Sequence, residues 1–306
     1  MSAHVISGKA IAADLRARVA DRVMSLRSGS VRPGLATLIV GERYEARAYE
    51  RRLRRLAGEL DCHYVCESLS GEVGQDEVLA AIGKLGGDPR ISGILVLRPL
   101  PEHISEVSLY QAIAPLKDIE AMHPVNAGLF ALGRPRYVPS TPASAFHMID
   151  CYLRSTGRDP SDVYPAANLV VVGRSNNVGR PAALLALARD ATLVSCDIHT
   201  SRAGLLRGHT SAADILIVAV GVPGLITADD VKPGAIVIDI GINAVPDERT
   251  GKTRLVGDVD IASVGAIAEA VSPVPGGVGP ITDTWLLRNT VLAAELSALG
   301  RDGAIT

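Results

Sequence analysis

Short apolar runs rich in β-branched residues alternate with helical stretches along most of the chain, and this alternation restricts the possible folds most strongly. In the first half, helical patterns at 44–60 and 75–86 separate apolar runs at 35–40, 62–69 and 93–97. Four further runs follow in the second half, at 168–173, 192–196, 214–220 and 235–241. Parallel strands need long crossover connections, usually helices, so this order predicts an α/β protein built on parallel sheets.

The regular alternation is lost near residues 115–142, where proline, glycine and polar residues cluster, and helical patterns resume near Ala143 and near Ile281. We predict that residues 1–147 form an N-terminal three-layer α/β domain, which a C-terminal helix within 280–306 completes. Residues 148–279 are predicted to form a Rossmann-type dinucleotide-binding domain. The cleft between two such domains is the expected ligand site.

The charge balance argues against a protein that binds nucleic acid. Lysine and arginine total 31 and aspartate and glutamate 33, which gives a formal net charge of −2 and no global attraction for polyanions. Aromatic residues make up 3% of the chain, which leaves few platforms on which bases could stack. We therefore expect a small-molecule ligand.

The four cysteines are scattered and form no CxxC pair, which is typical of reduced thiols in a cytoplasmic protein. They are Cys62, Cys66, Cys151 and Cys196. Cys62 and Cys66 flank His63, but no second ligand cluster accompanies them, so no metal site is expected. The start of the chain does not resemble a signal peptide, and no run of about 20 apolar residues exists. A soluble cytoplasmic protein without a membrane span is expected.

The stretch YEARAYERRLRRLAGEL, residues 44–60, is rich in arginine but has an apolar stripe at helical spacing. Tyr49, Leu53, Leu56 and Leu60 fall on one face of a helix, and the arginines of 51–55 point elsewhere. The stripe could be ordinary core beneath solvated arginines, or it could form one wall of an active site.

The stretch VVVGRSNNVGRP, residues 170–181, predicts a strand, a glycine turn and a helix that begins near Val178. Gly173 permits a tight turn and Gly179 a close approach of helix and backbone, as in sites that bind a pyrophosphate. The match to the dinucleotide-binding pattern is imperfect, because Ser175 replaces the second glycine and the spacing is one residue longer. A plain strand–helix corner remains the alternative.

Two residues near this turn favour opposite cofactors. Asp197 follows the next predicted strand, where a carboxylate commonly accepts the ribose hydroxyls of NAD. Arg174 could instead bind the 2′-phosphate of NADP. The sequence therefore leaves NAD and NADP open.

Six segments occur in the order found in the bifunctional methylenetetrahydrofolate dehydrogenase/methenyltetrahydrofolate cyclohydrolase (FolD) family, which the chain resembles over nearly its full length. They are GILVLRPLP (93–101), KDIEAMHPVNAG (117–128), PSTP (139–142), VVGRSNNVGRP (171–181), GDVD (257–260) and PVPGGVGPIT (273–282). The resemblance implies a folate substrate, a nicotinamide cofactor and a homodimer. It implies hydride transfer from 5,10-methylenetetrahydrofolate to NAD or NADP, followed by hydrolysis of the methenyl product.

The resemblance also implies the site residues. Tyr49 and Glu120 are the catalytic candidates. The substrate-binding candidates are Leu53, Leu97, Pro275, Gly276, Gly277 and Ile281. The cofactor-binding candidates are Gly173, Arg174, Ser175, Val178, Gly179, Asp197, Thr200, Val220, Gly221 and Ile242.

Three of the four catalytic side chains that the resemblance implies are changed. Leu53 stands where the family has lysine, Leu97 where it has glutamine, and Glu120 where it has the aspartate that holds the pterin. Leucine cannot transfer a proton, and replacing both members of a polar pair avoids leaving one unsatisfied. Helix and strand geometry directs Arg52 and Arg98 away from these positions.

We therefore predict an oxidoreductase whose cyclohydrolase activity is lost or very weak. The alternatives are a repurposed enzyme that acts on another folate adduct or small substrate, and a non-catalytic protein that binds folate or cofactor.

Three other polar sites receive structural interpretations. His123 is expected to shape a hinge loop. His199 and Thr200 stand near the expected adenosine phosphate, in a loop that is longer than the family's. Ser140 and Thr141 are expected to cap the helix that begins near Ala143.

Overall fold

The computed structural model describes residues 2–246 and 253–300, which divide into two units. Unit 1 combines Met1–Ala13 with Thr141–Thr282, and unit 2 combines Asp14–Ser140 with Asp283–Thr306. The predicted division differs from this one in three respects. The later boundary lies after Thr282 instead of after residue 279. The boundary near residue 147 lies seven residues earlier (Ser140 against 147), and the first 13 residues belong to unit 1 because their strand joins its sheet.

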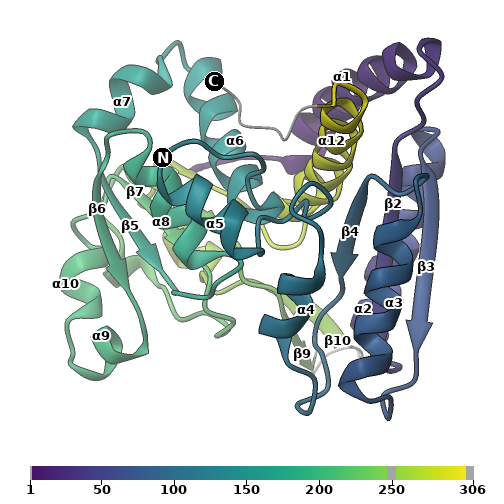
Figure 1. Cartoon of the computed structure of the whole chain (residues 1–306). Helices are drawn as coiled ribbons and strands as arrows, with labels where there is room; N and C mark the ends of the chain where they lie inside the picture. The colour runs from purple at the N-terminus through teal and green to yellow at the C-terminus, as the bar shows by residue number, and fades with distance from the viewer. Residues whose placement is uncertain (1, 247–252, 301–306) are drawn as a thin grey trace. The chain divides into compact units, whose positions relative to one another are not determined.

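Unit 2 is built on a three-stranded parallel sheet with the order β3-β2-β4 (Figure 1). Its strands are β2 (Gly34–Val40), β3 (His63–Leu69) and β4 (Gly93–Val96). The helices whose residues lie wholly or mainly in this unit are α1 (Gly8–Ser28), α2 (Tyr44–Glu59), α3 (Gln75–Gly87), α4 (Glu106–Ala112), α5 (Pro124–Ala131) and α12 (Val278–Ala298).

Both faces of the central strand β2 are buried, which makes unit 2 a three-layer structure. Leu35 and Ile39 belong to a core cluster with residues of α2 and α12. Ala36 and Leu38 point to the other face and join a second cluster with residues of α3 and α4. Successive strand residues face opposite ways, so the uniformly apolar sequence of β2 reflects burial on both sides. The predicted three-layer domain completed by the C-terminal helix is confirmed.

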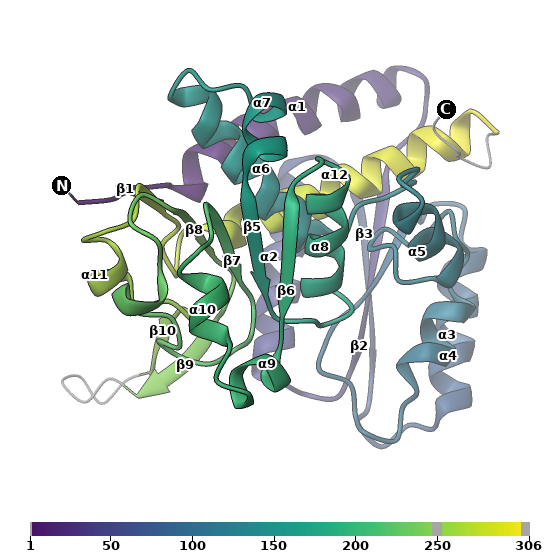
Figure 2. The ribbon, with the colours of Figure 1, turned by 90° about the vertical axis from the view of Figure 1, so that its left-hand side faces the viewer.

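Unit 1 contains a six-stranded parallel sheet with the order β1-β11-β8-β7-β5-β6, of which Figure 2 shows β8, β7, β5 and β6 side by side. The strands are β1 (His4–Val5), β5 (Asn168–Val172), β6 (Thr192–Cys196), β7 (Ile215–Val218), β8 (Ile236–Asp239) and β11 (Ala270–Val271). From β5 the chain moves to β6 on one side and then returns to β7 on the other. This reversal creates a switch point, the place at which doubly wound sheets bind nucleotides. The predicted Rossmann-type fold is confirmed.

Short helices and one hairpin complete unit 1. The helices are α6 (Ser140–Ser155), α7 (Pro160–Ala166), α8 (Gly179–Leu187), α9 (Ile198–Arg202), α10 (Leu206–Thr210), the 3-10 helix η1 (Ala228–Asp230) and α11 (Ile261–Val264). Strands β9 (Asn243–Pro246) and β10 (Thr253–Val256) pair with each other in an antiparallel ribbon.

Two helices begin three residues earlier than the sequence predicted. Helix α6 starts at Ser140 instead of near Ala143, and α12 starts at Val278 instead of near Ile281. In each case a proline, Pro142 or Pro280, lies in the first turn, where its missing N–H breaks no helical hydrogen bond. The predicted capping by Ser140 and Thr141 is therefore wrong, because both residues are already inside α6.

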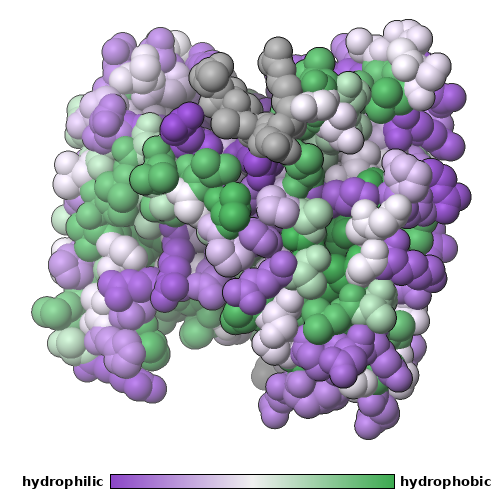
Figure 3. All heavy atoms as spheres, viewed as in Figure 1, coloured by the Kyte–Doolittle hydropathy of each residue, from purple (hydrophilic) through white to green (hydrophobic). Residues whose placement is uncertain are grey.

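No helix in 2–246 or 253–300 is long and apolar enough to cross a bilayer. Figure 3 shows hydrophilic residues on the visible surfaces of both units, interspersed with smaller hydrophobic areas.

Candidate active site and cofactor site

Helix α2 presents the predicted apolar stripe to the core of unit 2. Leu53 is fully buried, Leu56 and Leu60 are nearly so, and Tyr49 is half-buried against the same cluster. Arg51, Arg52, Arg54 and Arg55 are exposed, as the helical spacing predicted. The arginine-rich stretch is thus an amphipathic helix with Tyr49 at the edge of its buried face.

Leu53 and Leu97 belong to one apolar cluster. Their exposed fractions are 0% and 3%, and the cluster also contains Ile119, Ala121 and Tyr137. Leu97 directly follows β4, and its backbone N–H donates to the carbonyl of Leu38. The two positions at which the resemblance implies lysine and glutamine are therefore packed hydrocarbon.

The two neighbouring arginines are bound to other groups. The Arg52 Nε lies 3.2 Å from the Asp283 Oδ2, and its guanidinium carbon is 5.0 Å from the centroid of the Tyr49 ring. The Arg98 Nη2 lies 2.9 Å from the Glu106 Oε2 and also donates to the Tyr110 hydroxyl. Each of the two arginines is therefore paired with a carboxylate in the structure.

Glu120 is held by the first residue of α6. The backbone N–H of Ser140 donates to Oε1 over 3.0 Å, and the Ser140 hydroxyl donates to Oε2 over 2.8 Å. Burial raises the pKa of Glu120 to about 7, although the hydrogen bonds from Ser140 oppose that shift. The next residue, Ala121, has a φ of 54°, a left-handed conformation that is more usual for glycine.

Tyr49 lies among acidic groups that the sequence did not single out together. Burial, followed by the charges of Asp283 and Glu120, raises the pKa of Tyr49 well above its ordinary value. Its hydroxyl therefore remains protonated near neutral pH and can donate a hydrogen bond. Asp283 was missed because it is one of several polar residues of α12, and the sequence does not show which of them lies near Tyr49.

The loop after Glu120 is organised by Asp118, which sequence reasoning also missed. Its carboxylate accepts hydrogen bonds from the backbone N–H groups of Met122 and His123 and from the Asn126 side chain. The His123 Nδ1 accepts from the Val125 N–H and caps α5. His123 thus ends this loop as a helix cap, and no hinge role is visible in these contacts.

The segment 173–179, here called the phosphate turn, joins β5 to α8. Gly173 has a φ of 117°, and a Cβ added to it would lie 2.2 Å from the carbonyl oxygen of Ala219. A Cβ on Gly179 would lie 2.0 Å from the carbonyl oxygen of Gly173. Val178 is the N-cap residue of α8, and the Ser175 hydroxyl accepts from the Gly179 N–H. The tight backbone and the helix N-terminus fit a nucleotide pyrophosphate, as in other Rossmann-type turns.

Asp197 and Arg174 meet at the end of β6. The Arg174 Nη1 lies 3.0 Å from the Asp197 Oδ2, and the Arg174 Nε donates to the Ser195 hydroxyl. The Asp197 Oδ1 accepts from the backbone N–H groups of His199 and Thr200, which caps α9. The two residues that favoured opposite cofactors are therefore partners in one ion pair.

The predicted cofactor residues Val220 and Gly221 follow β7, and their backbone N–H groups donate to the Asp258 carboxylate over 2.7 and 2.9 Å. Asp258 is fully buried and comes from the GDVD segment. Beside it, burial raises the pKa of Asp239 to about 6, while three backbone N–H groups donate to its carboxylate. Ile242, in contrast, is 64% exposed. The two aspartates hold the loops that follow β7 and β8.

The predicted substrate residues near 275–281 form the link into α12. The Gly276 carbonyl accepts from the Gly8 N–H over 2.9 Å, and a Cβ on Gly277 would lie 2.5 Å from the Pro273 carbonyl oxygen. Ile281 is fully buried, and the bond before Pro275 is cis.

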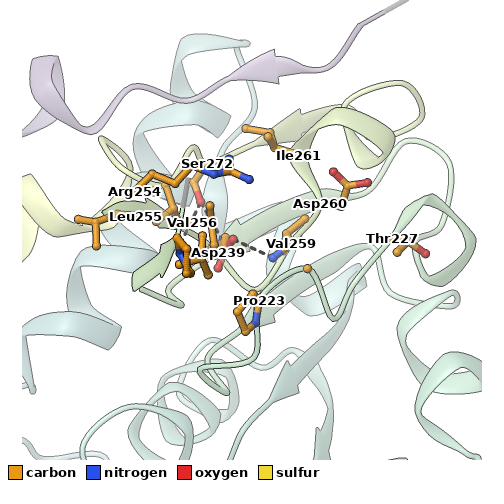
Figure 4. A pocket seen from close by; sticks show the side chains of 15 residues that line it. Pro223, Thr227, Asp239, Arg254, Leu255, Val256, Val259, Asp260, Ile261 and Ser272 are labelled. Atoms are coloured by element: carbon orange, nitrogen blue, oxygen red, sulfur yellow. Dashed lines mark hydrogen bonds between the residues drawn. The ribbon is translucent and has the colours of Figure 1, made fainter. Parts of the chain in front are cut away.

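A pocket of about 940 Å³ lies in unit 1 beside the β9–β10 ribbon (Figure 4). Asp239, Ser272 and Arg254 are among its lining residues, and none of the predicted site residues lines it. The predicted cofactor residues of the phosphate turn therefore lie outside this pocket. No group of three or more potential metal ligands occurs in the described ranges 2–246 and 253–300.

Comparisons with known proteins identify both parts of the chain. Residues 6–120 match the catalytic domain of tetrahydrofolate dehydrogenase/cyclohydrolase, and residues 139–298 match its NAD(P)-binding domain. Bifunctional protein FolD 3 of Rubrobacter xylanophilus is 60% identical over 296 residues, which cover 96% of this chain and 93% of that protein.

Solved structures agree with these matches. The bifunctional enzyme FolD from Campylobacter jejuni has a TM-score of 0.87 and 33% identity, covering 97% of this chain and 100% of that one. FolD from Trypanosoma brucei, complexed with NADP cofactor and inhibitor, has a TM-score of 0.86 and 32% identity, covering 97% and 99%. The chain therefore belongs to the tetrahydrofolate dehydrogenase/cyclohydrolase family.

Proposed function

We propose that the chain oxidises 5,10-methylenetetrahydrofolate to 5,10-methenyltetrahydrofolate with NAD or NADP, and that its cyclohydrolase activity is absent or very weak. Relatives that match most of the chain carry the name bifunctional protein FolD. The glycines of the phosphate turn fit a dinucleotide. Tyr49 and Glu120 keep a phenol and a carboxyl group at two of the positions that the resemblance assigns to catalysis.

Hydride transfer makes modest demands on the protein. The nitrogens of the folate supply the electron pair as the hydride leaves, so the site mainly has to position substrate and cofactor. In this proposal Tyr49, which stays protonated, and Glu120, which Ser140 holds in place, orient the folate. Leu53 and Leu97 lie in the core cluster against which Tyr49 packs, and they offer no polar group there.

The complete burial of Leu53 is the observation that carries the proposed loss of hydrolysis. Attack of water on the methenyl cation needs a group that transfers protons beside the water. Leucine at positions 53 and 97 offers none. Arg52 and Arg98 are paired with carboxylates, and a guanidinium stays protonated near neutral pH, so neither is a suitable base.

The test follows the absorbance of reduced nicotinamide and of the methenyl product after mixing the protein with methylenetetrahydrofolate and NAD or NADP. We expect both products to accumulate in equal amounts, and the methenyl band to decay no faster than in buffer with heat-inactivated protein. The matched control is the Leu53→Lys/Leu97→Gln double variant, in which we expect faster decay of that band. Decay that depends on the unchanged protein would overturn the proposed loss.

A second candidate is an enzyme that acts on another folate adduct or small substrate. The acidic surroundings of Tyr49, with Glu120 and Asp283 near it and no lysine at position 53, favour this alternative. Cofactor binding without turnover of methylenetetrahydrofolate would support it. The absence of binding to either cofactor would leave a non-catalytic protein.

We also propose a homodimer in the cytoplasm. The β9–β10 ribbon pairs with no further strand within the part of the chain that is described, and an isolated two-stranded ribbon is marginally stable. A second copy could cover it. Light scattering coupled to size exclusion tests the dimer, because a monomer at micromolar concentration would contradict it. The four cysteines form no disulfide, which suits a reducing compartment, and cell fractionation tests the location.

A further inference from the structure

We propose that Asp197 makes this chain select NAD over NADP, and that Arg174 serves as the partner of Asp197 instead of binding a 2′-phosphate. The proposal rests on the cofactor site of the family and is independent of which folate the enzyme oxidises.

Arg174 uses three of its nitrogens in contacts at the end of β6. Nη1 lies 3.0 Å from the Asp197 Oδ2, Nε donates to the Ser195 hydroxyl over 3.1 Å, and Nη2 donates to the Ser195 carbonyl over 2.5 Å. The guanidinium is thus fixed along β6 with its charge balanced. A phosphate could recruit it only by breaking this arrangement.

Asp197 is fixed as firmly as Arg174. Its Oδ1 accepts from the backbone N–H groups of His199 and Thr200. The Asp197 N–H in turn donates to the Thr200 hydroxyl, which completes a capping box. These backbone hydrogen bonds and the charge of Arg174 lower the pKa of Asp197, so its carboxylate is ionised at neutral pH. Oδ2 still has acceptor capacity beside Arg174 and, with 20% of the side chain exposed, can accept a hydroxyl.

The two cofactors differ at the group that would meet this carboxylate. The adenosine ribose of NAD has a 2′-hydroxyl, which donates to a carboxylate, whereas NADP has a phosphate with a charge near −2. The phosphate would face the Asp197 carboxylate directly, or it would draw Arg174 away and leave that carboxylate without its counter-ion. Both arrangements weaken NADP binding, and neither affects NAD.

The contact between the two side chains resolves what the sequence leaves open. Arg174 alone favours NADP, and Asp197 alone favours NAD. In the ion pair the guanidinium of Arg174 is already engaged, and the partly exposed carboxylate of Asp197 decides which cofactor is preferred. We expect a preference for NAD on the order of 100-fold, typical of a like-charge contact in a partly exposed site.

The experiment measures binding of NADH and NADPH to the full chain by calorimetry, without folate, so it does not depend on catalytic turnover. We expect NADH to bind at least about tenfold more tightly than NADPH. Asp197→Asn keeps an acceptor for the α9 cap and removes the charge, and it should reduce this ratio at least about tenfold. In the Asp197→Asn variant the guanidinium of Arg174 is available to a phosphate. Adding Arg174→Ala to that variant should therefore remove the NADPH affinity that was gained.

The matched control is Asp229→Asn, which removes one charge from an exposed aspartate of unit 1 that pairs with Arg207. Its NADH-to-NADPH ratio should equal that of the unchanged protein. Circular dichroism checks that each variant is folded. Four results would overturn the proposal: equal or tighter binding of NADPH by the unchanged protein, no binding of either cofactor, an unchanged ratio in Asp197→Asn, or an equal effect of Asp229→Asn.

Discussion

Glu120, which is half-buried, accepts two hydrogen bonds from one residue, Ser140. The hydrogen bonds favour the ionised form, but burial outweighs them and raises the pKa to about 7 from an ordinary value of 4.5. The folded protein therefore binds this proton more tightly than the unfolded chain does. Stability must then depend on pH across the interval between the two values.

The replacement Glu120→Gln tests this dependence. Below about pH 4.5 Glu120 is protonated in both states, and its contribution to stability is fully present. As the pH rises to about 7, the unfolded chain ionises first and that contribution is lost, by at most about 3 kcal/mol. Glutamine cannot ionise. The free energy of unfolding of the variant, relative to that of the unchanged protein, should therefore rise by about 2–3 kcal/mol between pH 5 and pH 8.

Urea unfolding of both proteins at four pH values in that interval measures the effect. Other carboxyl groups with raised pKa values, such as Asp118 and Asp283, are present in both proteins and cancel in the comparison. A stability difference that stays constant with pH would contradict the assignment to Glu120.

Asp190 follows α8 in a left-handed conformation, with a φ of 58°, and it is exposed. A side chain with a Cβ is strained there, and a negative charge at a helix C-terminus opposes the helix dipole. Asp190→Gly should therefore stabilise the protein by about 1 kcal/mol. Asp190→Asn removes only the charge and should give less than half of that gain. Thermal unfolding compares the three proteins, and a destabilised glycine variant would show that the aspartate has an unrecognised contact.

Helix α2 contributes Leu53 and the residue after β4 is Leu97, the two positions at which the resemblance implies a lysine and a glutamine. Leu53→Lys alone would bury a charge without a partner and should destabilise the protein by about 3 kcal/mol or more. Leu97→Gln alone would bury an amide at a cost of about 1–3 kcal/mol. If the positions are neighbours, as their shared cluster indicates, each polar residue satisfies the other in the double variant.

A double-mutant cycle of urea unfolding measures that coupling. We expect the double variant to be more stable than the sum of the single changes predicts, by about 1–3 kcal/mol. Strictly additive costs would mean that the two side chains do not meet and that their replacement was not coordinated.

The elements that the sequence predicted have an apolar run of at least four residues or a helical stripe. Strand β2 and helix α2 were located to within one residue, because burial on both faces and a helical stripe leave clear patterns. Strands β1 and β11 have two residues each, too few for any period, and they exist because they pair with each other and with β8. Along β9 and β10, buried and exposed side chains alternate only weakly.

The contacts at the site could be predicted from the sequence less well than the fold. Glu120 could be placed because a motif surrounds it, but its bond to Ser140 spans 20 residues. The ion pair of Arg174 and Asp197 depends on side-chain rotamers at the ends of two adjacent strands. No residue pattern encodes such choices, which follow from packing.

The chain passes between the two units three times, and each passage lies at or within a helix. The division falls after Ala13 within α1, at the start of α6 and after Thr282 within α12. Domain boundaries usually lie in exposed linkers, where each side can unfold alone. When a boundary lies inside a helix, the backbone hydrogen bonds of that helix continue from one unit into the other. We therefore expect the two units to unfold together.

Trp285 makes this expectation measurable, because it is the single tryptophan of the chain and lies on the unit 2 part of α12. Residues 139–298 match an NAD(P)-binding domain, and we propose that the cofactor binds there at the phosphate turn of unit 1. Saturating NAD, at about 100 times its dissociation constant, should stabilise whatever unfolds with that turn by about 2.7 kcal/mol. If the helices couple the units, the fluorescence transition of Trp285 should move upward by roughly 4 °C, together with the circular dichroism of the whole chain. If the cofactor leaves the midpoint of the Trp285 transition unchanged but shifts the midpoint of another transition, the units unfold separately. That result would show that these helices break at the boundary.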